Sequence, residues 1–186
     1  MKKSLITLMA GAALAITSFT ANAQMKDPMV GGAAMYPTKN IVENAMASPI
    51  HKTLVAAVKA AGLVDTLEGA GPFTVFAPTD DAFAKLPAGT VDTLVKPENK
   101  ATLTKILTYH VVAGHLTAAD LDRLIDKGHG SATLTTVSGG TLVLTKNGSR
   151  NISIHDESGD IADINVYDVL QSNGVIYSID RVLLPK

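Results

Sequence analysis

The stretch Gly71–Phe83, with the sequence GPFTVFAPTDDAF, restricts the possible folds of this chain more than any other segment. Its run Phe73–Ala77 is aromatic and β-branched, which predicts a short strand. Val75 and Phe76 lie in this run without polar alternation, so we expect both faces of the strand to be buried. Pro78 cannot donate a ladder hydrogen bond, and the strand should end there.

The residues after this strand predict a short helix. The hydroxyl of Thr79 can accept a hydrogen bond from a free N–H in the first helical turn. Asp80 and Asp81 follow in that turn, where negative charge meets the positive end of the helix dipole. Phe83 should face back onto the strand, and Pro87 should end the helix.

The remainder of the chain is predicted to form helices first and strands later. Apolar periodicity and capping residues predict helices over Asn40–Ser48, His51–Ala61, Thr90–Val95 and Pro97–Tyr109, and a further helix after Thr117 with Leu121, Leu124 and Ile125 on its apolar face. Alternating patterns between turn signals predict strands over Ala132–Val137, Thr141–Thr145, Asn151–His155, Ile161–Leu170 and Val175–Ile179. The last two strands should pair antiparallel, because their connection is too short for a crossover. This order indicates an α+β fold.

Three motifs of the chain resemble those of the fasciclin-like domain family. FTVFAPTDDAF is similar to the first family signature, GVIYSIDRVLLP at Gly174–Pro185 is similar to the second, and Tyr109-His110 matches the Tyr-His pair between them. The resemblance covers roughly Tyr36 to Lys186. It implies a wedge-shaped, twisted β-sandwich with several helices packed alongside. It also implies that the signature residues mostly keep the fold: Phe73, Val75, Phe76, Pro78, Thr79, Asp80, Phe83, Gly174, Ile176, Ile179 and Pro185.

The N-terminal residues have the pattern of a secretory signal peptide. Lys2 and Lys3 precede the apolar run Leu5–Ile16, and Ala21-Asn22-Ala23 is an A-x-A cleavage site. We therefore expect a signal peptide over residues 1–23, cleavage after Ala23, a flexible linker over 24–36 and a fasciclin-like domain over 37–186. The protein should be secreted or periplasmic.

Net charge and composition limit the kinds of partner that the chain is expected to bind. The formal net charge is −1, and removal of the two signal-peptide lysines gives −3, without a basic block typical of nucleic-acid binding. The chain has no cysteine, so an exported domain would fold without disulfides. No later stretch is apolar enough for a transmembrane segment, and we expect a monomer.

No motif predicts catalysis or a cofactor. G-x-S-x-G, S-x-x-K and a glycine-rich phosphate loop are absent from the sequence. Asp156–Asp160 is acidic like a calcium loop, but it lacks the ligand spacing and is better explained as a solvated turn. Asp80-Asp81 is better explained by capping than by acid–base chemistry. We therefore expect neither an enzyme nor a catalytic or metal site.

The resemblance implies an adhesion or binding module that contacts a cell-surface, matrix or envelope component, either protein or glycan. The alternative is a periplasmic carrier of a small molecule or of copper with Met or His ligands. Its possible ligands are Met25, Met29 and Met35, together with the five histidines His51, His110, His115, His129 and His155.

Tyr109 and His110 have two interpretations. The family resemblance suggests that they are binding contacts. Their position suggests a structural role, because His110 follows a helix whose apolar face is formed by Leu103, Ile106 and Leu107. A histidine there could donate to a nearby carbonyl or carboxylate, with Asp80 as one candidate. We favour the structural role.

Overall fold

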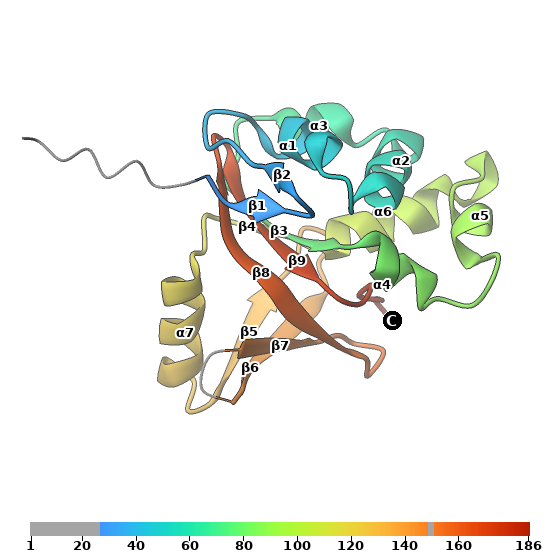
Figure 1. The fold of residues 1–186 in the computed structure, drawn as a ribbon. Helices are drawn as coiled ribbons and strands as arrows, with labels where there is room; N and C mark the ends of the chain where they lie inside the picture. The colour runs from blue at the N-terminus through green and yellow to red at the C-terminus, as the bar shows by residue number, and fades with distance from the viewer. Residues whose placement is uncertain (1–26, 149–150) are drawn as a thin grey trace, which may run out of the picture.

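The fold is described here from a computed structural model, which covers residues 27–148 and 151–186; the expected signal peptide and Met25 lie outside these ranges. The helices are α1 (Ile41–Ala47), α2 (Lys52–Ala61), α3 (Val64–Glu68), α4 (Asp80–Ala84), α5 (Thr90–Leu94), the 3₁₀ turn η1 (Pro97–Asn99), α6 (Lys100–Tyr109) and α7 (Ala118–Lys127). Helices α1 to α6 gather on one side of the sheet, and α7 lies apart from them (Figure 1).

The main sheet contains seven strands in the order β4-β3-β9-β8-β7-β6-β5. These strands are β3 (Phe73–Pro78), β4 (Val111–Ala113), β5 (Ser131–Thr135), β6 (Thr141–Asn147), β7 (Asn151–His155), β8 (Ile161–Gln171) and β9 (Gly174–Ile179). The pairing of β3 with β9 is parallel, and every other neighbouring pair in this sheet is antiparallel.

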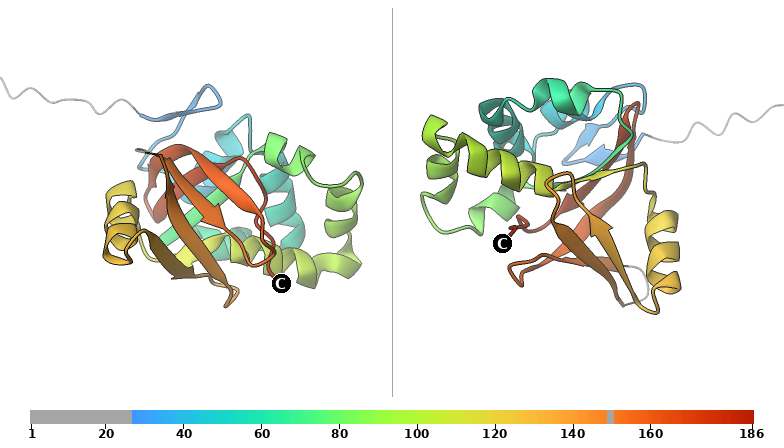
Figure 2. Two further views of the ribbon diagram at one scale, coloured as in Figure 1. Left: turned by 90° about the horizontal axis from the view of Figure 1, so that it is seen from below. Right: turned by 180° about the vertical axis from the view of Figure 1, so that it is seen from behind.

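The long strand β8 makes the sheet curl. Its first residues pair with β7, its later residues pair with β9, and its register with β9 shifts twice between Ile164 and Val169. Bulges of this kind bend a strand and increase its twist. The two halves of the sheet therefore turn toward each other, as the two further views show (Figure 2), and a bridge between Val112 and Thr136 links their outer edges.

Two hydrophobic cores lie on opposite faces of the central strands. Val75 and Ala77 point into the core that the helical cluster covers. Phe76 points into the second core, inside the curl of the sheet, where its ring stacks on Tyr177 with centroids 5.7 Å apart. The alternation along β3 explains why both faces of this strand are buried, as the sequence predicted.

The predicted α+β class is confirmed, with one refinement of the expected architecture. The expected sandwich is a single curled sheet whose halves face each other, because β8 continues from one half into the other. Thr79 accepts a hydrogen bond from the N–H of Ala82, as expected of a helix cap. Thr117 and Asp120 form a reciprocal capping box at the start of α7.

Several local predictions differ from the structure. Val64–Glu68 forms helix α3, a segment for which the sequence pattern predicts no helix. The helix expected from Pro97 begins with a 3₁₀ turn, and α6 starts at Lys100. Leu124 was placed on the apolar face of α7 but is 37% exposed, because only one narrow stripe of this helix packs on β5 and β6.

The described part of the expected linker is ordered. β1 (Met29–Val30) and β2 (Ala33–Ala34) form a hairpin, and Val30 and Met35 are buried in the core beneath the helical cluster. The small residues of this segment gave no periodicity from which a two-residue strand could be predicted. Burial of these two side chains accounts for its order.

Candidate functional site

The two signature stretches lie side by side at the centre of the sheet. Phe73 is in register with Gly174 at one end of the parallel pair, and Pro78 is in register with Ile179 at the other. A Cβ atom on Gly174 would lie 2.1 Å from the carbonyl oxygen of Phe73, so only glycine allows this approach. Segments about a hundred residues apart thereby form one unit.

Most signature side chains are core residues. Val75 and Ile176 face the helical cluster, whereas Phe76 and Ile179 face the second core. The buried members are Val75, Phe76, Pro78, Phe83, Gly174, Ile176 and Ile179, and the half-buried members are Phe73, Thr79, Asp80 and Pro185. Their burial fits the role of keeping the fold that the resemblance implied.

Tyr109 is completely buried at the end of α6. Its hydroxyl donates to the carbonyl oxygen of Thr141 at 2.7 Å and accepts from the N–H of Glu157 at 2.9 Å. Burial raises the pKa of Tyr109 to about 12, so the phenol stays neutral. A Cβ on Gly140 would lie 2.6 Å from the ring, which shows how closely the β5–β6 turn covers this side chain.

His110 is also buried and uses both ring nitrogens. Nδ1 lies 2.8 Å from the carbonyl oxygen of Ile106, and Nε2 lies 2.9 Å from the backbone nitrogen of Leu183. Because the Leu183 N–H can only donate, Nε2 must accept and Nδ1 must carry the proton. Burial lowers the pKa of His110 to about 4, which favours this neutral form.

The suggested pairing of His110 with Asp80 does not occur. Asp80 instead accepts a hydrogen bond from the backbone N–H of Thr53 at 2.8 Å, because α4 packs against the start of α2. Burial acts to raise the pKa of Asp80, but the hydrogen bonds from Thr53 and Lys52 and the nearby His51 outweigh it, and the pKa lies below its usual value.

The histidine near Asp80 is His51, which the sequence suggested only as one of five possible histidine ligands of a carrier. Its ring is buried between the hydroxyls of Ser48, at 2.7 Å, and Ser178, at 3.2 Å. Burial lowers the pKa of His51. Ser48 precedes His51 by three residues, but the contact with Ser178 depends on tertiary packing that no local pattern encodes.

An open depression of about 540 Å³ lies where the two signature strands end, and we call it the polar depression because seven of its nine lining residues are charged or polar. Lys85 and Asp180 form an ion pair across it, with nitrogen and oxygen 2.9 Å apart. Asp81 and Asn165 are exposed on its wall. The complete lining is Ile50, Thr79, Asp80, Asp81, Lys85, Asn165, Val166, Ser178 and Asp180. This mixture of charged, amide and hydroxyl groups suits reversible polar contact with a partner.

The described histidines that were proposed as carrier ligands do not belong to any cluster suited to a metal ion. Within residues 27–148 and 151–186, no group of three or more His, Cys, Asp or Glu side chains could hold a metal ion. Met35 is buried, whereas Met29 is 52% exposed. Of the histidines other than His51 and His110, His115 and His129 are exposed and His155 is half-buried.

In the acidic turn Asp156–Asp160, the carboxylate of Asp156 accepts hydrogen bonds from groups of the protein itself. Oδ1 of Asp156 accepts hydrogen bonds from the hydroxyl of Ser158 and from the N–H groups of Gly159 and Asp160. Oδ2 accepts from the N–H of Leu184 at 2.8 Å. This carboxylate therefore closes the turn and ties it to the C-terminal segment.

The comparisons with known proteins agree with this architecture. The family model for the fasciclin domain matches residues 49–185. The chain is 47% identical over 161 residues to Protein sll1483 of Synechocystis sp., covering 86% of this chain and 81% of that protein. It is 34% identical over 160 residues to immunogenic protein MPB70 of Mycobacterium bovis, covering 86% of this chain and 70% of that protein. The cell surface glycolipoprotein MPB83 of the same species is 36% identical over 161 residues, covering 84% of this chain and 64% of that protein.

A solved structure shows the same fold. It is a FAS1 domain pair from the insect cell adhesion molecule fasciclin I, with a TM-score of 0.68, 21% identity and coverage of 78% of this chain and 51% of that one. The curled sheet, its central parallel pair and the helical cluster define a small α+β module, and this fold is the one seen in that domain pair. The chain belongs to the fasciclin domain family. Membership supports a non-enzymatic adhesion or binding module.

Proposed function

We propose that this protein is an exported, non-enzymatic binding module that attaches to a cell-surface, matrix or envelope component, protein or glycan. The observation that carries this proposal is the open polar depression at the ends of the two signature strands. Its exposed groups Asp81 and Asn165 lie on helix α4 and strand β8, and sites built on helices and strands are more precise than sites on loops.

The names of the relatives support an extracytoplasmic location. MPB83 is named a cell surface glycolipoprotein, and the solved neighbour comes from a cell adhesion molecule. Across the described ranges, no helix has both the length and the apolar character to cross a membrane. Together with the signal-peptide pattern of residues 1–23, these observations favour a secreted or periplasmic protein.

In this proposal, Tyr109 and His110 act through the fold rather than by touching the partner. Both side chains are buried, and their polar atoms are bound to the backbone of Thr141, Glu157, Ile106 and Leu183. Their contribution to adhesion is to hold the shape of the domain. The carrier alternative has less support, because Met35, His51 and His110 are buried and the two histidines are engaged within the protein.

The test is a pull-down from envelope and host-surface extracts with the full chain and with the double variant Asp81→Ala, Asn165→Ala. We expect the variant to capture less of the specific partner while melting like wild type. Asp92→Ala is the matched control, because Asp92 is an exposed acid on α5 that does not line the depression. Equal capture by the double variant would contradict this site.

A further inference from the structure

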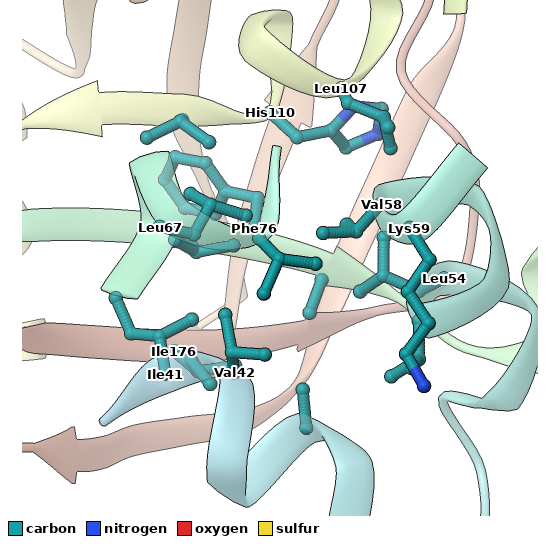
Figure 3. Close-up of a pocket in the computed structure, with 16 residues that line it drawn as sticks. Ile41, Val42, Leu54, Val58, Lys59, Leu67, Phe76, Leu107, His110 and Ile176 are labelled. Carbon is teal, nitrogen blue, oxygen red and sulfur yellow. The ribbon is translucent and has the colours of Figure 1, made fainter. Parts of the chain in front are cut away.

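An apolar pocket lies between the helical cluster and the sheet (Figure 3). It has a volume of about 40 Å³ and is walled by α1, α2, α3, α6, β3 and β9. We propose that this pocket binds the aliphatic chain of an anionic amphiphile such as a fatty acid, and that Lys59 at its mouth holds the acid group. This site is separate from the polar depression and goes beyond the proposed function.

The lining of the pocket selects hydrocarbon over water. Only two of its sixteen lining residues carry ionisable side chains, Lys59 and His110. Both ring nitrogens of His110 are already bound to Ile106 and Leu183, so this ring offers no free polar atom. The pocket exceeds the space of roughly 10–15 Å³ that a single water needs, but a stable water also needs about two to four polar partners. An apolar chain meets no such requirement.

Two smaller voids adjoin this pocket in the same layer. One, of about 30 Å³, shares with it the residues Leu67, Leu107 and Val111, and reaches the exposed side chain of Val137. The other, of about 10 Å³, shares Ala45, Ala77 and Ile176 with it. Its remaining lining includes the apolar Val30 and Met35 and the buried polar residues Asn44, Ser48 and His51. The main pocket therefore shares side-chain walls with each of the two smaller voids. Displacement of these side chains would give an aliphatic chain more length than the main pocket alone provides.

Helix α3 is the shortest and least buried of the helices that line the pocket, and a hydrogen bond from the Asn173 side chain to the carbonyl oxygen of Leu67 attaches it to the start of β9. It spans only Val64–Glu68 and contains no buried residue. Its half-buried Val64 and Leu67 line the pocket, and Leu67 also lines the adjoining void that reaches Val137. A short helix with so little buried surface opens at low free energy. Displacement of α3 would join the two voids and admit a chain from the surface.

The lining residue at the mouth of the pocket that carries a full charge is a lysine. Lys59 lies in the last turn of α2, and its nitrogen lies at the edge of the lining side chains (Figure 3). None of the ion pairs formed by the described residues involves Lys59. The ammonium of Lys100 lies beside Gly62, the residue that ends the same helix. An anionic head group is therefore complementary to this rim, and a cationic one is not.

Calorimetry with three amphiphiles of equal chain length tests the proposal. The full chain, purified and delipidated, is titrated with dodecanoate, dodecanol and dodecyltrimethylammonium below their micelle concentrations. We expect saturable binding that is tightest for dodecanoate and weakest for the cation. Lys59→Met should weaken dodecanoate binding by about three- to fivefold, the size of a partly exposed ion pair, and leave dodecanol binding unchanged. Lys52→Met is the matched control, because Lys52 is an exposed lysine of α2 outside the pocket.

Methyl NMR of the wild-type protein places the ligand without depending on a variant. Shifts at Val58, Leu67 and Leu107 are expected on addition of dodecanoate, whereas Leu142 and Leu144 in the second core should not move. The proposal is overturned if dodecanoate shows no saturable binding, if the cation binds equally well, if Lys59→Met and Lys52→Met behave alike, or if the shifts occur in the second core.

Discussion

Nε2 of His110 accepts a hydrogen bond from the backbone N–H of Leu183, 73 residues further along the chain. This contact ties the end of α6 to the segment that follows β9. The opposite side of the ring is held by the carbonyl oxygen of Ile106, one turn earlier in α6. Because a neutral imidazole can donate at one nitrogen and accept at the other, His110 meets both backbone groups without burying a charge.

His110→Ala should lower the free energy of unfolding by about 1–3 kcal/mol, because it leaves the buried N–H of Leu183 unpaired. Urea unfolding measures this loss, with the exposed His129→Ala as the control. Any loss of partner binding by His110→Ala or Tyr109→Ala should follow the loss of fold. Variants that melt like wild type but no longer bind would contradict the structural role and make the pair a contact site.

Stability should fall on acidification because of His110. Its pKa in the folded protein is about 4, below the ordinary value of 6.5, so the unfolded chain binds the proton more readily. The neutral form therefore contributes its full stabilisation above about pH 6.5, and the contribution is lost as the pH falls toward about 4, for a total of about 3 kcal/mol. His51 acts in the same direction because burial lowers its pKa as well.

Unfolding curves across this pH range, recorded for wild type and His110→Ala, check the assignment. The variant should lose less stability than wild type on acidification, since only His51 would then contribute among the buried histidines. Parallel pH dependence in the two proteins would show that His110 is not responsible.

Phe76→Ala should cost about 3–5 kcal/mol, the usual loss for a buried aromatic side chain. Phe76 is fully buried and stacks on Tyr177, so its removal would leave a cavity inside the curl of the sheet. That loss is a large fraction of the stability of a typical domain. A denaturation midpoint that is unchanged within error would mean that the second core does not depend on this ring.

Export should remove the first twenty-three residues, so the exported protein should begin at Gln24. N-terminal sequencing or intact-mass measurement of protein from the periplasm or medium checks this prediction. An exported protein that retains Met1 would refute cleavage after Ala23.

The sequence predicted the central elements well because their signals are local. The strand Phe73–Ala77, the Thr79 cap and the helix after Thr117 depend on residues within a few positions of one another. The hairpin β1–β2 and helix α3 were missed, because both are too short for periodicity to show.

The candidate sites depended on contacts that no pattern reveals. His110 was expected to reach toward Asp80, but its partners are main-chain atoms of Ile106 and Leu183, which carry no residue-specific signal. The position of His51 between Ser48 and Ser178, and the polar depression, arise only when β3 and β9 lie side by side.

The position of β9 between β3 and β8 also determines the stage at which the sheet can be completed. A partly emerged chain that does not yet include Gly174–Ile179 lacks β9, the strand that joins β3 to β8 in the sheet. Long-range pairing of this kind forms slowly and late. A polypeptide that passes through a secretion channel would therefore stay unfolded until its last strand emerged. The whole domain could then fold in one step.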